Sequence, residues 1–112
     1  MKRLVSIVLA LVLVMSLAAP SLAEEKAVKK IAFCFQDLET EFWVAGYKAI
    51  TTTLREQGVE VLEYNGNEDA NKQLEQVNDA IAQGVDGIII IPQDGESAVT
   101  IVKTANKANV PI

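Results

Sequence analysis

Four consecutive isoleucines at positions 88–91 constrain the fold of this chain more than any other feature. The side chains of a strand point alternately to the two faces of a sheet, so an unbroken apolar strand must be buried on both. Gly84 precedes the segment and Pro92 follows it, which limits it to the length of a strand. It therefore predicts a strand over 85–91 at the centre of a parallel sheet that helices cover.

Strand-like and helix-like segments alternate along the rest of the chain. Residues 31–35 are apolar at every position, and 59–64 are predicted as a further strand. Helices are expected over 41–57, 70–83 and 96–108, the first two ending at Gly58 and Gly84. Residues 110–112 are expected to open a fourth strand. The order β-α-β-α-β-α-β predicts an α/β fold with a doubly wound parallel sheet.

The helical period also predicts which side chains form the core. The inward faces of the second and third helices are expected to be Ala70, Leu74, Val77 and Ile81, and Ala98, Ile101, Val102, Ala105 and Ala108. Cys34 is the only cysteine and lies within an apolar strand, so no internal disulfide can form. We expect it to be a small buried hydrophobe without a reactive role.

Residues 1–23 have the layout of a secretory signal peptide. Lys2 and Arg3 are followed by an apolar run from 4 to 19, then by Pro20 and the small residues of a cleavage site ending at Ala23. The alternative is a membrane anchor, but the run is shorter than the ~20 residues that a spanning helix needs. The sequence therefore predicts export, with 24–112 as the mature part.

Charge and composition exclude several classes of function. Residues 24–112 hold 8 basic and 15 acidic residues, a net charge of −7, which argues against nucleic acid and anionic membranes as partners. Because the chain has no histidine, this stretch cannot form a Ser-His or Cys-His catalytic pair. It also lacks a transition-metal ligand cluster, a phosphate loop and a dinucleotide fingerprint. We predict no cofactor and no enzymatic activity.

Polar side chains gather after each predicted strand, where the loops share one edge of the sheet. These are Asp37, Glu39, Thr40 and Glu41; Asn65, Asn67, Glu68 and Asp69; and Gln93, Asp94 and Glu96. In open α/β sheets ligands bind beyond the carboxyl ends of the strands. Amides and carboxylates can hydrogen-bond hydroxyl groups, the neighbouring Phe42 and Trp43 offer flat apolar faces, and the loops have no Lys or Arg. This combination indicates a sugar rather than an anionic ligand.

Structural roles compete with ligand binding at several of these positions. Glu41, Asp69 and Glu96 lie where acidic residues favour the helix dipole. Asp94 is placed to cap the third helix, which is compatible with ligand contact. Phe42 and Trp43 are adjacent in a helix and point about 100° apart, so at least one of them could face the core. These alternatives stay open from the sequence.

The chain resembles the start of a type 1 periplasmic binding protein of the ribose-binding, sugar ABC transporter kind. The matching blocks are IAFCF, ETEFWVAGYKAI, EQGVEVLEYNGNEDANKQLEQVNDAIAQGVDGIIIIPQDGESA and VKTANKANVPI. The resemblance covers the mature segment, about a third of the usual family length. It implies that 24–112 is the first part of the N-terminal lobe of a two-lobe protein that closes on a sugar and delivers it to a membrane permease.

The resemblance also assigns roles to particular residues. Phe42 and Trp43 match the family's aromatic pair, which packs against the sugar ring, and Thr40 takes the place of its preceding asparagine. Asp94 keeps the family's loop aspartate, whereas Ile91 replaces an asparagine of many ribose-binding members. With Asp37 and Gln93 from the loop pattern, the predicted ligand residues are Thr40, Phe42, Trp43, Asp94, Asp37 and Gln93.

Three other functions compete with sugar capture for transport. A sensory module of the same fold would present its ligand to a membrane receptor or chemotaxis protein, and a receptor or kinase segment after residue 112 would favour it. A sugar-responsive repressor would start with a DNA-binding helix-turn-helix, whereas this chain starts with an export signal. A secreted enzyme would need its catalytic groups elsewhere in the protein.

Overall fold

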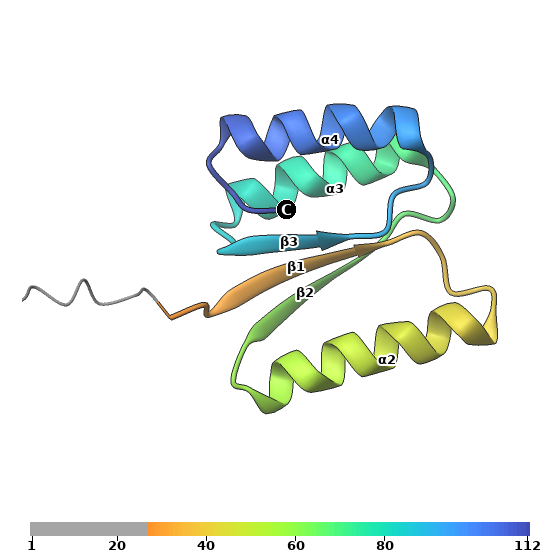
Figure 1. The fold of residues 1–112 in the computed structure, drawn as a ribbon, viewed down its shortest axis with the longest axis vertical. Coiled ribbons are helices and arrows are strands. Elements are labelled where there is room, and N and C mark those ends of the chain that lie inside the picture. The colour runs from red at the N-terminus through yellow and green to blue at the C-terminus, as the bar shows by residue number, and fades with distance from the viewer. Residues whose placement is uncertain (1–26) are drawn as a thin grey trace, which may run out of the picture.

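The computed structural model describes residues 27–112, so the predicted signal peptide lies outside the described residues. Strands and helices alternate along this stretch, as predicted (Figure 1). The elements are β1 (Lys30–Phe35), α2 (Glu41–Glu56), β2 (Glu60–Asn65), α3 (Ala70–Ala82), β3 (Gly87–Ile90) and α4 (Gly95–Lys107). None of the helices within 27–112 is long and apolar enough to cross a membrane.

The three described strands form a parallel sheet in the order β2-β1-β3. Helix α2 covers one face, and α3 and α4 lie side by side on the other (Figure 1). The predicted doubly wound α/β fold is therefore confirmed. Since β2 and β3 lie on opposite sides of β1, the chain reverses its direction of winding between β1 and β3. In such sheets this switch point marks the crevice where ligands bind.

The core has a separate layer on each face of the sheet. Toward α3 and α4, the buried side chains include Cys34, Val77, Ile101 and others of one apolar cluster. Toward α2, the rings of Phe33 and Phe35 contact that of Tyr47, with centroids 6.1 and 5.1 Å from it. Burial raises the pKa of the Cys34 thiol to about 12, which keeps it protonated and unreactive.

The isoleucine-rich strand is not central among the described strands. That position belongs to β1, whose residues 32–35 are all buried, whereas Ile89 and Ile90 of β3 are only half-buried. The expected fourth strand is also absent from the described sheet, since 110–112 have no strand assignment. The N–H of Ile88 nevertheless donates to the carbonyl of Pro111 at 2.9 Å, so this segment runs beside β3.

The predicted inward helix faces need partial correction. In α4, Ile101 and Ala105 are buried as expected, but Val102 is 39% exposed and Ala108 is exposed. In α3 the fully buried stripe is Gln73, Val77 and Ala80, with Leu74 and Ile81 packed at its margin. Helix α3 is therefore rotated about its axis, by part of one residue position, relative to the predicted orientation. This rotation places Gln73 in the core.

Candidate functional site

The loops after the three strands are hydrogen-bonded to one another at the carboxyl edge of the sheet. The Gly66 N–H donates to the Phe35 carbonyl at 2.9 Å, and the Glu68 N–H to the Gln36 carbonyl at 3.0 Å. On the other side of β1, the Ile91 N–H donates to the Cys34 carbonyl at 2.9 Å. The loops that carry the predicted ligand residues therefore form one connected edge, as the sequence predicted.

Asp37 holds the first of these loops in shape. Its side chain is 8% exposed, and its Oδ1 accepts a hydrogen bond of 2.8 Å from the Glu39 N–H, an Asx turn. This bond orders the chain just before α2 begins. It leaves the second carboxylate oxygen as the group with which Asp37 could meet a ligand, a role that stays a prediction.

Thr40 and the two aromatic residues form the start of α2. Thr40 is the N-cap of the helix, and its Oγ1 accepts from the Trp43 N–H at 3.4 Å. Phe42 is 74% exposed and Trp43 is half-buried. Their rings meet edge to face, with centroids 5.0 Å apart and planes at 71°. Phe42 is therefore not part of the core of residues 27–112, and the pair presents apolar surface beside the loop of β1.

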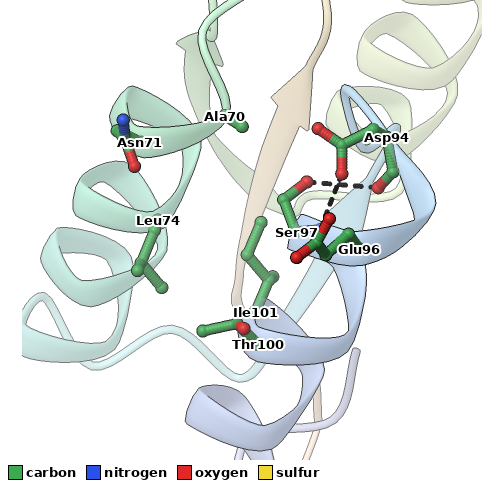
Figure 2. Close-up of a pocket in the computed structure, with 8 residues that line it drawn as sticks. All are labelled: Ala70, Asn71, Leu74, Asp94, Glu96, Ser97, Thr100 and Ile101. Atoms are coloured by element: carbon green, nitrogen blue, oxygen red, sulfur yellow. Dashed lines mark hydrogen bonds between the residues drawn. The ribbon is translucent and has the colours of Figure 1, made fainter.

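Asp94 caps α4, which confirms the structural role predicted for it. Its Oδ1 accepts a 2.7 Å hydrogen bond from the Ser97 N–H, and the Ser97 hydroxyl donates to the Asp94 carbonyl at 3.1 Å (Figure 2). Hydrogen bonds to the carboxylate, first from the Ser97 N–H and then from the Ser97 side chain and the Glu96 N–H, lower the pKa of the Asp94 carboxyl. The side chain is therefore a stable carboxylate at the exposed end of the helix.

A groove lies between the first turns of α3 and α4, beside Asp94. Its volume is about 310 Å³, with Leu74 and Ile101 as its apolar part and Asn71, Ser97 and Thr100 among its polar groups (Figure 2). Of the six predicted ligand residues described in 27–112, only Asp94 lines this groove. Helix α2, which carries Phe42 and Trp43, covers the opposite face of the sheet (Figure 1), and neither ring lines the groove.

Gln73 is a residue of this edge that the sequence did not reveal. It is completely buried, its Nε2 donates to the Ile91 carbonyl at 2.9 Å, and its Oε1 accepts from the Gln93 N–H at 2.8 Å. Its spacing of four and seven residues from Val77 and Ala80 places it in their buried stripe. A glutamine at such a spacing is the signal that could have identified it, because a buried amide must be hydrogen-bonded.

Gln93 itself is partly buried and contributes an acceptor. Its Oε1 is buried and has no hydrogen-bond partner among the described residues. The three loops 36–40, 65–69 and 91–94 contain no Lys or Arg. Residues 27–112 also contain no group of His, Cys, Asp and Glu side chains arranged to hold a metal ion. The loops of this edge thus offer hydrogen-bond acceptors and contain no cation of their own, while Lys72 follows in the first turn of α3.

The Asp94 cap predicts a pH-dependent contribution to stability. Because the folded-state pKa lies below its ordinary value of 3.8, the stabilisation is complete above that value and is lost as the pH falls through the folded pKa. We expect Asp94→Ala to lower the melting temperature at neutral pH, and this difference to shrink below about pH 4. Asp94→Asn, which keeps a capping oxygen, should show a smaller loss. Equal losses at pH 7 and at the acid limit would contradict the prediction.

Comparison with known proteins now defines the class of this chain. Residues 31–112 match the family model described as periplasmic binding protein domain. The ribose import binding protein of Bacillus subtilis is 31% identical over 121 residues, covering 100% of this chain and 40% of that protein. The D-xylose-binding periplasmic protein of Escherichia coli is 26% identical, covering 91% of this chain and 31% of its own length.

Solved structures agree in fold. An ABC transporter solute-binding protein from Bacillus halodurans, with bound myo-inositol, has a TM-score of 0.70 and 30% identity, covering 80% of this chain and 31% of that one. Another from Mycobacterium smegmatis, with bound glycerol, has a TM-score of 0.71 and 27% identity over 75% of this chain and 29% of that one. The chain belongs to the periplasmic binding protein family, as the resemblance implied.

Proposed function

We propose that the full-length protein is an exported solute-binding protein that captures a neutral monosaccharide or a related polyol for an ABC transporter. The observation that carries this proposal is the aromatic pair of exposed Phe42 and half-buried Trp43 beside sheet-edge loops that are rich in acceptors and contain no Lys or Arg. The named relatives that bind ribose, xylose and myo-inositol support the same class of ligand. The proposal includes a membrane permease as partner, a location outside the cytoplasmic membrane, and no catalysis.

The chemistry of the edge fits the two kinds of surface that a sugar offers. The C–H face of a pyranose or furanose ring is apolar and can pack on Phe42 and Trp43. Its hydroxyl groups can donate to the carboxylates of Asp37 and Asp94, and hydrogen bonds to charged groups are the stronger ones, about 1.5–3 kcal/mol each. Thr40 and Gln93 would add neutral hydrogen bonds at the rim.

Calorimetric titration of the full-length protein tests this function. The panel should include ribose, xylose, myo-inositol and glycerol, with a sugar phosphate and an amino acid as charged controls. We expect one neutral sugar or polyol to bind with a Kd in the micromolar range or tighter, about −8 kcal/mol. Binding of a charged ligand in preference to every neutral one would contradict the proposal.

Truncation of one ring tests the aromatic surface. Trp43→Ala should weaken binding of that ligand by about 10- to 100-fold, since it removes both buried apolar area and stacking. Trp43→Phe keeps a flat ring at the same place and should lose less. Unchanged affinity in Trp43→Ala, measured on a folded protein by the same titration, would remove this residue from the site.

A further inference from the structure

We propose that Gln73 is the positioning residue for the candidate ligand loop 91–94. Its buried side-chain amide holds the backbone beside Gln93 and Asp94 in position. This inference rests on the proposed function for its effect on sugar affinity. The hydrogen bonds from Gln73 to this loop, here called the clasp, can be tested without any ligand.

Two hydrogen bonds from one side chain define the path of this loop. Nε2 of Gln73 donates to the Ile91 carbonyl at 2.9 Å, and Oε1 accepts from the Gln93 N–H at 2.8 Å. The amide thus bridges Pro92, because it bonds to the carbonyl of the preceding residue and to the N–H of the following one. Because Gln73 is completely buried, water cannot replace it at either bond. Gln73 therefore holds the loop 91–94 against α3.

The side chain is itself held in place by close packing. A Cβ built on Gly66 would lie 2.7 Å from Gln73 Cγ and 3.1 Å from its Nε2. The glutamine therefore lies directly on the backbone of the loop after β2, where the Gly66 N–H donates to the Phe35 carbonyl. The Gln73 side chain thereby joins the end of β3 to the loop after β2, and the backbone of Gly66 joins that loop to the end of β1.

A neighbouring glutamine shows that the clasp on the third loop is particular to Gln73. Gln76 lies three residues further along α3, and its Nε2 donates to the Asn65 carbonyl at the end of β2, at 2.8 Å. It makes no hydrogen bond to 91–94 among those found in the described residues. Both amides stabilise the edge, but only Gln73 reaches the loop that carries Gln93 and Asp94.

The test uses the full-length protein with Gln73→Met and a matched control, Val77→Ala. Methionine has nearly the same length and fills the site without either hydrogen bond, while Val77 is fully buried one turn away in the same helix. Amide exchange of the Gln93 N–H, followed by NMR, should accelerate at least about tenfold in Gln73→Met relative to Val77→Ala. Affinity for the sugar identified by titration should fall about tenfold in the first and stay within about twofold in the second.

A second variant keeps the proposal falsifiable if Gln73→Met does not fold. Gln73→Leu also fills the site with an apolar side chain and without either hydrogen bond, so it should accelerate exchange of the Gln93 N–H and weaken sugar binding to a similar extent. Unchanged Gln93 exchange in Gln73→Met would overturn the clasp, and affinity within twofold of wild type would overturn the positioning role. If the wild-type protein binds no neutral sugar, the proposed function fails, whereas the exchange experiment still decides the clasp.

Discussion

Replacing Gly66 by alanine is expected to lower the free energy of unfolding by about 2–4 kcal/mol. The added Cβ would meet the side chain of Gln73 at 2.7 Å, a distance that Cβ atoms do not tolerate. Gln73 is completely buried, and protein interiors are packed too densely for a side chain to move aside without cost. If it moves, the Ile91 carbonyl and the Gln93 N–H both lose their partner, and each unpaired buried group costs about 1–3 kcal/mol.

Urea unfolding of the full-length protein measures this loss, and Gly46→Ala is the matched control. Gly46 lies inside α2, and a Cβ there meets nothing within 4 Å. The same substitution should therefore be neutral or stabilising by about 0.5–1 kcal/mol, the ordinary gain of alanine over glycine in a helix.

A double-mutant cycle makes the cause specific. Gln73→Ala removes the atoms that the new Cβ would meet, so the combined variant should be less destabilised than the sum of the two single variants. Strict additivity, or a loss at Gly66 no larger than at Gly46, would show that the close contact has no energetic consequence.

The sequence predicted the elements of this fold well because local patterns determine them. Gly58 and Gly84 adopt φ values of +79° and +72°, the left-handed conformation expected where helices end. The doubly wound arrangement followed from alternating strands and helices, and it was confirmed. The order of the strands in the sheet was harder to predict, because an apolar run indicates that a strand is buried but not which strands lie beside it. The isoleucine run therefore indicated the centre of the sheet, although β1 occupies that position among the three described strands.

The candidate site was predictable only where a side chain acts on its local backbone. Asp94 could be recognised as a cap from its position before a helix, and the structure confirms that role. Gln73 could not be recognised in the same way, since its partners lie 18 and 20 residues away in the sequence. Its role depends on how α3 is rotated about its axis against the sheet. The apolar pattern predicted this rotation only to within one residue position. Ligand contacts of the six predicted residues stay predictions.

Phe33→Ala is expected to cost about 3–5 kcal/mol, the usual range for removing a fully buried ring. Phe33 is completely buried in β1, and its ring lies 5.4 Å from that of Phe35 and 6.1 Å from that of Tyr47. Because Tyr47 belongs to α2, the loss weakens the packing that holds this helix, and with it Trp43, against the sheet.

Phe42→Ala is the control for Phe33→Ala, because it removes the same side chain from an exposed position instead of a buried one. Phe42 is 74% exposed, so Phe42→Ala should change stability by no more than about 0.5 kcal/mol. It should instead weaken sugar binding, because its apolar surface is proposed to meet the ligand. Urea unfolding and calorimetric titration of both variants separate the two roles. A large loss of stability at Phe42, or a small one at Phe33, would mean that α2 packs on the sheet differently from the arrangement described.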